Sequence, residues 1–355
     1  MRMNSAWAPL LACALLLSAA GLARAEASPG AQGGPLPLLA VPASAAGSAG
    51  IAPAASAASA APASAAAPSL VVPAGLAGAL DVPDEAELAR RLSPADEIPV
   101  LANNQVLAFY GHPFSKKMGI LGEYSKEELA KLLRGYAKLY DDANGPGLGV
   151  VPAFYLIYGT CWPEGEIGYL RESVVKEYID YAASQGMLVF VDHQIGKYKV
   201  EEAVKRLLPF AKYPNVHLAL DPEWRTTAPM KEIGSISAEE LNKAQAMIDD
   251  YLKQEGIPGR KMLVVHQFKG RMIEGRERVR ADFGKVILVH TADGFGAPAL
   301  KRNSYAFNAK APNMPIKGFK LFFKSGVPGA GYDDPLLTPP EVLALDPMPM
   351  LIMYQ

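Results

Sequence analysis

The chain has 355 residues, half of them hydrophobic, and its 35 basic and 36 acidic residues leave a formal net charge of −1. This length accommodates two or three average domains, or one barrel of roughly 250 residues with additional segments. The balanced charge excludes the strongly basic surface that binds nucleic acid or an anionic membrane, so we expect neither as a partner.

The first 25 residues have the features of a secretory signal peptide. Arg2 supplies a basic start, residues 7–22 form an apolar run, and residues 23–25 supply a small-x-small cleavage pattern. The run is too short for a stable membrane span. Cys13 resembles a lipidation site, but few apolar residues precede it, so cleavage after Ala25 is favoured. The sequence predicts an exported protein, periplasmic or extracellular, with no membrane insertion after cleavage.

Residues 26–80 are rich in Ala, Pro, Ser and Gly and contain no charged or aromatic residue after Glu26. Such a segment buries too little apolar surface to offset the entropy of ordering it, which predicts a disordered linker. Residues 81–97 are expected to form a short helical lead-in. Residues 98–355 are expected to form one folded domain.

From residue 98 onward, short apolar runs alternate with segments of helical spacing. We expect helices around residues 125–136, 174–183, 200–211 and 237–254, the first opening with a capping box at Ser125 and Glu128. We expect strands at residues 105–110, 150–158, 187–191, 217–220, 262–265, 286–289, 319–323 and 350–353.

Eight buried-type strands joined by crossovers indicate a parallel sheet. The strand count and the length favour a single-domain (β/α)8 (TIM) barrel over an open doubly wound sheet, whose glycine-rich turn after the first strand is missing from the sequence. The fold class is therefore α/β, with a signal peptide and a linker ahead of the barrel.

Active sites of such barrels lie at the C-terminal ends of the strands, so polar residues that follow the predicted strands are the candidates. Four of the five histidines fall there, whereas a purely structural role would scatter polar residues over both rims. The residues that we predict to bind substrate are Tyr110, His112, Tyr158, Trp162, Gln194, Trp224, His266, Gln267, His290, Lys324 and Tyr354.

Asp221 and Glu223 give the most specific signal. Residues two apart on a strand face the same way, so both carboxylates should point into the mouth of the barrel. Neighbouring carboxylates disfavour each other's ionisation, so one tends to keep its proton, as a glycosidase acid must. The alternative is that Glu223 forms a structural ion pair with Arg225 or Arg271.

This Asp-x-Glu motif at the end of strand four resembles that of (β/α)8-barrel glycoside hydrolases such as the family 18 chitinases and the family 25 muramidases. The chain is also similar to secreted bacterial barrels that carry Asp-Pro-Glu-Trp and Val-His-Gln-Phe runs. The resemblance implies a glycoside hydrolase with Glu223 as general acid and Asp221 as supporting carboxylate. The substrate would be a cell-envelope or extracellular polysaccharide.

Asp192 and Asp293 are both candidates for a second catalytic carboxylate, and the sequence does not choose between them. A rival hypothesis is a metal-dependent hydrolase that uses Asp192, His266 and His290, with His193 as a further ligand. A third is a barrel that binds glycan without cleaving it. We expect the glycosidase, acting as a monomer with neither metal nor cofactor.

Overall fold

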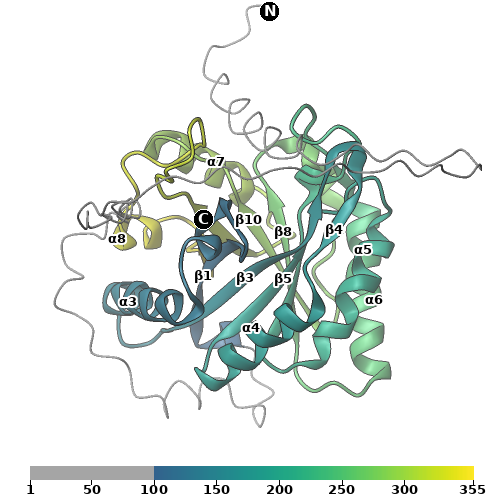
Figure 1. Ribbon diagram of the computed structural model, residues 1–355, viewed down its shortest axis with the longest axis horizontal. Coiled ribbons are helices and arrows are strands. Elements are labelled where there is room, and N and C mark those ends of the chain that lie inside the picture. The colour runs from purple at the N-terminus through teal and green to yellow at the C-terminus, as the bar shows by residue number, and fades with distance from the viewer. Residues whose placement is uncertain (1–99) are drawn as a thin grey trace, which may run out of the picture.

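The structure is a computed structural model, and it describes residues 100–355. The predicted signal peptide, the linker and the helical lead-in lie outside the described residues. Eight parallel strands close into a barrel with helices around it, as Figure 1 shows. The predicted single-domain (β/α)8 barrel is therefore confirmed.

Each barrel strand pairs in parallel with the next one, and β1 closes the ring by pairing with both β3 and β12. Two antiparallel strands extend β1 and β3 as hairpins at their C-terminal ends: β2 (Ser115–Gly119) and β4 (Ile167–Tyr169). The barrel strands are β1 (Asn104–His112), β3 (Gly149–Cys161), β5 (Leu188–His193), β6 (Val216–Leu220), β8 (Lys261–Gln267), β10 (Val286–Ala292), β11 (Ile316–Leu321) and β12 (Leu351–Tyr354).

Six of the seven crossovers contain an α-helix. The one between β8 and β10 has instead the short strand β9 (Ile273–Glu274), paired with β7 (Ile236–Ser237), and two 3-10 turns. The helices are α3 (Lys126–Asn144), α4 (Glu172–Ser184), α5 (Val200–Leu207), α6 (Ala238–Gln254), α7 (Pro298–Ala309) and α8 (Pro339–Leu343). The 3-10 turns are η4 (Val100–Ala102), η5 (Ile120–Gly122), η6 (Pro163–Gly165), η7 (Leu208–Lys212), η8 (Pro222–Trp224), η9 (Gly270–Met272) and η10 (Arg276–Arg278).

The helix starts follow from local capping. Ser125 precedes α3 and forms the predicted capping box, in which the Glu128 amide donates to Ser125 Oγ at 3.3 Å and the Ser125 amide donates to Glu128 Oε2 at 2.9 Å. Ser237 and Glu240 form the same motif ahead of α6. Each motif satisfies amide groups that the first helical turn leaves without a partner.

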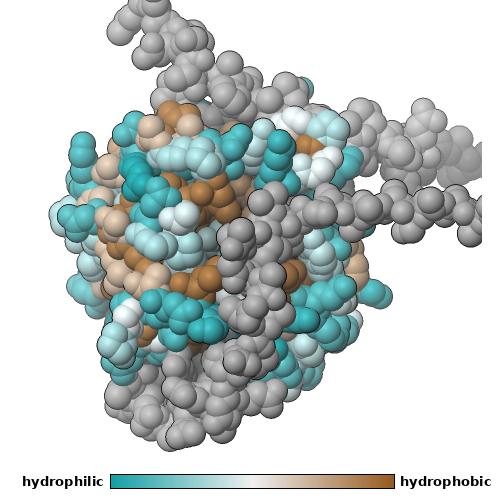
Figure 2. Space-filling model, turned by 90° about the vertical axis from the view of Figure 1, so that its left-hand side faces the viewer, coloured by the Kyte–Doolittle hydropathy of each residue, from teal (hydrophilic) through white to brown (hydrophobic). Residues whose placement is uncertain are grey.

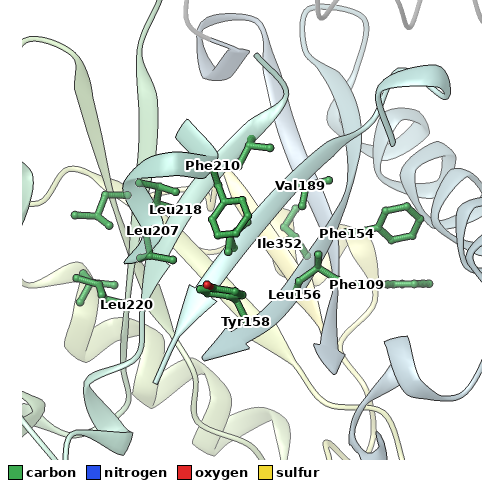
Figure 3. Packing of buried hydrophobic residues seen from close by; sticks show 14 of the residues in the cluster. Phe109, Phe154, Leu156, Tyr158, Val189, Leu207, Phe210, Leu218, Leu220 and Ile352 are labelled. Atoms are coloured by element: carbon green, nitrogen blue, oxygen red, sulfur yellow. The ribbon is translucent and has the colours of Figure 1, made fainter. Parts of the chain in front are cut away.

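The strands bury apolar side chains on both faces because the barrel wall separates two hydrophobic layers. Inward-facing side chains fill the barrel interior, among them Val106, Ala108, Val151, Ala153, Leu188, Phe190, Met262, Val264, Leu351 and Met353. Outward-facing side chains such as Phe109, Phe154, Leu156, Val189 and Leu218 pack beneath the helices, as Figure 3 shows. Burying one such Leu or Phe contributes about 1.5–3 kcal/mol.

The outer helices turn polar residues to solvent. Along α3 the buried residues Leu129, Leu133, Tyr136 and Tyr140 recur at the helical period, so one face of the helix packs on the barrel. Figure 2 shows the face on the side of α3 and α8, where hydrophilic residues lie between smaller hydrophobic patches. No helix between residues 100 and 355 has the length and hydropathy to cross a membrane.

The predicted start of the seventh barrel strand, β11, is wrong. The strand begins at Ile316 and not at Phe319. The sequence hides this start because Lys317 looks like a surface residue. Its side chain is in fact buried, and its ammonium donates to the carbonyls of Asn308 and Ala311 at the end of α7, at 2.8 and 2.9 Å.

Candidate active site

Polar side chains converge at the C-terminal mouth of the barrel. All are buried except Glu223, which is half-buried, and they come from β1, β3, β5, β8, β11 and the segments that directly follow β6 and β10. We call them the mouth cluster: Tyr110, Tyr155, Asp192, Asp221, Glu223, His266, Asp293 and Lys320. The cluster contains all four residues that the sequence nominates as catalytic, together with Tyr110 and His266 from the predicted substrate-binding set.

A chain of short hydrogen bonds runs through His266. Its Nε2 lies 2.7 Å from the Tyr155 hydroxyl, and its Nδ1 lies 2.6 Å from Asp293 Oδ2. Burial by itself would lower the pKa of His266, but the adjacent Asp293 carboxylate, together with Asp192 and Asp221, more than offsets burial and raises the pKa to about 9. The imidazolium and Lys320 in turn hold the pKa of Asp293 below its usual value despite its burial. His266 and Asp293 therefore form an ion pair at neutral pH.

Lys320 brings a second positive charge into the mouth. Its ammonium lies 3.7 Å from the centre of the Tyr110 ring, a cation–π contact, and 3.5 Å from Asp293 Oδ2. The Tyr110 hydroxyl donates to Asp192 Oδ2 at 3.1 Å. Burial raises the pKa of Asp192, although the nearby positive charges of His266 and Lys320 oppose that rise.

Asp221 and Glu223 lie together, although not for the reason that the sequence suggests. Strand β6 ends at Leu220, and Glu223 belongs to the 3-10 turn η8, so strand alternation does not orient it. Asp221 caps the turn by accepting from the Glu223 amide at 3.1 Å. On the C-terminal side of the turn, the Gly234 amide donates to the Glu223 carbonyl at 2.6 Å. The turn thus fixes the backbone that carries Glu223.

The pKa values of these two carboxyls are higher than those of ordinary surface acids. Burial raises the pKa of Asp221 to about 7, with a further contribution from Asp192 that the positive charge of His266 opposes. Burial and the neighbouring Asp221 raise the pKa of Glu223 to about 8. At neutral pH the raised pKa of Glu223 therefore favours its protonated form.

The predicted alternative of a structural ion pair at Glu223 is not found. Arg225 turns to α6, where it forms a bidentate pair with Glu240 at 2.7 and 2.9 Å. Within residues 100–355 the Glu223 carboxyl makes neither an ion pair nor a hydrogen bond, with Arg271 or with any other residue, although the charge of Lys269 acts on it from farther away. No hydrogen bond or ion pair from the described residues therefore competes with a ligand for its acidic proton.

Two tyrosines that the sequence assigns to substrate point away from the mouth. Tyr158 lies in the outer apolar layer, where its ring centre is 5.0 Å from that of Phe210, and Figure 3 shows the two side chains together. Tyr354 packs among the aromatic residues next to α3, and its hydroxyl lies 2.8 Å from that of Tyr140. Both occupy outward positions of their strands, so their assignment to substrate is corrected.

Three further predicted ligands are buried outside the mouth cluster. His290 Nε2 lies 2.8 Å from Gln267 Oε1, and both side chains occupy the outer face of the wall, next to Lys317. Gln194 accepts from the Cys161 amide at 2.8 Å and so joins the ends of β5 and β3. His290 and Gln267 face away from the mouth, so their assignment to substrate is likewise corrected, whereas the assignment of Gln194 stays a prediction.

The remaining predicted ligands lie at the rim. His112 accepts from the Phe114 amide at 3.2 Å in the turn before β2, and Trp162 is 49% exposed on the hairpin of β3 and β4. Trp224 is half-buried in η8, next to Glu223. Lys324 lies beyond the end of β11 and is exposed, with its ammonium over the Tyr332 ring, so it does not end the strand as predicted.

The proposed metal ligands do not come together. Asp192 and His266 face the barrel interior, whereas His290 and His193 face outward, because neighbouring positions of a strand alternate between the two faces. The Tyr169 hydroxyl lies 3.3 Å from His193 Nε2 on that outer side. Among residues 100–355, no three His, Cys, Asp or Glu side chains are grouped as a metal site requires. This ligand set is therefore corrected.

Sequence reasoning missed Tyr155 and Lys320. Tyr155 lies in the middle of a long apolar run, so it does not read as a strand-end residue. Lys320 was hidden by the misplaced start of β11, which put it at the wrong end of the strand. A charged residue between Phe319 and Leu321 was the available signal, because a buried strand rarely carries a lysine without a specific partner.

No protein-family model matches the sequence, and no curated protein is similar to it in sequence. Several solved structures are distantly similar to the chain. An oxaloacetate acetylhydrolase has a TM-score of 0.45 and 13% identity, covering 76% of this chain and 80% of its own. A 2,3-dimethylmalate lyase has a TM-score of 0.42 and 13% identity over the same shares. A family 18 chitinase from Crocus vernus has a TM-score of 0.36 and 11% identity, covering 58% of this chain and 82% of its own. These likenesses are distant and assign no activity.

Proposed function

We propose that the chain is a glycoside hydrolase that acts on a polysaccharide outside the cytoplasm, with Glu223 as its general acid. One observation carries this proposal. The Glu223 carboxyl is half-buried at the mouth of the barrel, free of ion pairs within residues 100–355, and burial next to Asp221 raises its pKa to about 8. The location outside the cytoplasm rests on the signal-peptide features of residues 1–25.

In this mechanism Glu223 donates its proton to the glycosidic oxygen as the bond from that oxygen to the sugar C1 breaks. Asp221, whose carboxyl accepts from the Glu223 amide, supports the positive charge that develops on the sugar. Asp293 is the ionised carboxylate of the site, and its Oδ1 has no hydrogen bond within the described part of the chain. We assign it to accept the proton of the attacking water. Asp192 is fully buried, accepts a hydrogen bond from the Tyr110 hydroxyl, and helps to raise the pKa of Asp221.

The proposal is tested by comparing wild type with Glu223→Gln on a panel of envelope and extracellular polysaccharides, measuring the release of reducing ends. Glutamine keeps the size and polarity of the side chain but has no acidic proton. We expect kcat/KM to fall roughly 10²–10⁴-fold, the range of general acid catalysis. Glu239→Gln is the matched control, because Glu239 pairs with Arg278 on the outer surface of α6 and should not affect turnover.

Two outcomes contradict the proposal. A Glu223→Gln variant that turns over as fast as wild type would exclude Glu223 as the acid. A wild type that binds a glycan of the panel and cleaves none would favour the non-catalytic, glycan-binding barrel.

The pH profile gives a second test. The acid must be protonated to act, so kcat should fall tenfold per pH unit above about 8, where Glu223 ionises. Because the pKa of Asp293 is lowered, the acidic limb should begin below the usual range of a carboxyl group. An activity that rises between pH 8 and 10 would show that a deprotonated group does the work assigned to Glu223.

A further inference from the structure

A buried ion pair lies behind the mouth cluster. Lys301, on the first turn of α7, and Asp333, in the loop after β11, have side chains that are 0% and 1% exposed. The ammonium lies 3.3 Å from Asp333 Oδ2. The mechanism proposed above uses neither residue.

Lys301 contacts the backbone at, or next to, two charged residues of the mouth cluster, Lys320 and Asp293. Its ammonium donates to the carbonyl of Lys320 itself and to that of Gly294, the residue after Asp293. An ammonium has three N–H donors, and two carbonyls and one carboxylate satisfy all three. One side chain on α7 therefore joins the end of β11 to the loop that follows β10.

Asp333 secures the same two segments from the opposite side. Its Oδ1 accepts from the Gly296 amide at 3.0 Å, in the loop after β10. Its Oδ2 accepts from the Phe322 amide at 3.0 Å, two residues beyond Lys320. The Asp333 amide also donates to the Phe322 carbonyl at 2.9 Å. Each member of the pair thus contacts both the loop after β10 and the C-terminal end of β11.

Stability alone does not account for this pair. Taking two charges out of water is costly, and well-packed apolar residues often replace a buried ion pair without loss of stability. A lysine in the first turn of a helix is also unfavourable, because the positive end of the helix dipole lies there. An apolar pair cannot supply directed hydrogen bonds to four backbone groups, two in the loop after β10 and two at the C-terminal end of β11.

We infer that Lys301 and Asp333 are positioning residues, which hold Asp293 and Lys320 at their working separation by joining the loop after β10 to the C-terminal end of β11. Asp293 lies within hydrogen-bond distance of His266, so its position decides whether the His266–Asp293 pair forms. Lys320 lies 3.5 Å from the same carboxylate, so a small shift of the loop after β10 relative to the end of β11 separates the charges. The pair acts through these groups and does not touch the substrate.

The titration of His266 tests this inference directly. Asp293 is the main cause of the raised pKa of this histidine, with smaller contributions from Asp192 and Asp221, and burial opposes all three. The imidazole resonances of wild type and Lys301→Met can be followed by NMR against pH and assigned with a His266→Gln variant. We expect the wild-type midpoint near pH 9 and the variant's at least about one unit lower, a tenfold loss of proton affinity.

Lys317→Met is the matched control. Lys317 is also a buried lysine that donates to two carbonyls near α7, but it lies on the outer face of β11, away from the mouth. Its replacement should lower the free energy of unfolding and leave the His266 midpoint unchanged. A folded Lys301→Met with the wild-type midpoint would overturn the inference, and so would an equal shift in Lys317→Met.

Asp333→Asn serves if Lys301→Met does not fold. Asparagine keeps the shape of the side chain but loses its charge and one acceptor, so we expect a smaller shift in the same direction. An unchanged midpoint in folded Asp333→Asn also overturns the inference. The inference rests on the proposed function in taking Asp293 and Lys320 as working groups. Because the readout is a proton equilibrium, it succeeds or fails whether or not any glycan is cleaved.

Discussion

The two faces of the barrel wall use the same kinds of residue for different purposes. On the inner face at the mouth, His266 pairs with Asp293 among other charged groups. On the outer face, His290 pairs with Gln267, and burial holds its pKa well below the usual value. Both histidines are fully buried, and their strands β8 and β10 are neighbours.

The difference lies in what surrounds each histidine. His266 lies beside carboxylates, so it is charged, and a substrate or a change of pH can perturb its ion pair with Asp293. His290 lies beside an amide and the Lys317 ammonium, so it stays neutral and serves packing. A polar residue at the end of a strand is therefore informative only once its face of the wall is known.

The largest effect is expected from removing residues 350–355. This deletion removes β12, and with it the inward-facing and outward-facing side chains of one strand of the wall. β12 pairs with β1 and with β11, so its loss opens the barrel and exposes two unpaired edges. We expect no cooperative thermal transition and an aggregating product. A truncated chain that stays soluble and unfolds cooperatively on heating would contradict the closed barrel.

A smaller effect is expected from His266→Gln on the inner face. The change removes the positive charge that holds Asp293 ionised and in place. Because misplacing a working group by about 1 Å costs on the order of 100-fold, we expect kcat/KM to fall by about that factor while the protein remains folded. Steady-state kinetics and a thermal melt measure the two quantities. Wild-type kinetics in this variant would remove His266 from the site.

The smallest effect is expected from His290→Gln on the outer face. It disturbs one buried hydrogen bond and a packed ring, which should lower the free energy of unfolding by about 1–3 kcal/mol and leave kcat/KM unchanged. Denaturant unfolding measures the first quantity. A loss of activity as large as that of His266→Gln would abolish the distinction between the two faces.

The sequence sufficed for the fold because hydrophobic patterning determines it. All eight predicted strands exist, and the capping box at Ser125 begins α3 where expected. The misplaced strand, β11, contains two buried lysines, Lys317 and Lys320. A lysine lowers the apparent hydrophobicity of a strand, and its buried partners come from segments distant in sequence.

The site was less accessible to sequence reasoning, because it depends on which face of the wall a residue occupies. Tyr354 and His290 lie at the correct end of their strands but on the outer face, and a strand boundary misjudged by one residue reverses this assignment. Asp221 and Glu223 are neighbours, yet through a 3-10 turn that alternation does not predict. Lys320 lies at the mouth because β11 begins at Ile316, a start that the sequence pattern does not reveal.

Closure of the barrel also has a consequence for how the chain folds. Gln105 donates to the Pro349 carbonyl across 244 positions of sequence, and β12 lies between β1 and β11. Contacts between such distant segments form slowly, because the entropy of closing a long loop opposes them until the end. Tyr110 and Lys320 lie on the two strands that β12 joins, so their contact forms when the ring closes. We therefore expect the mouth cluster to be completed late in folding, after most of the hydrophobic layers are in place.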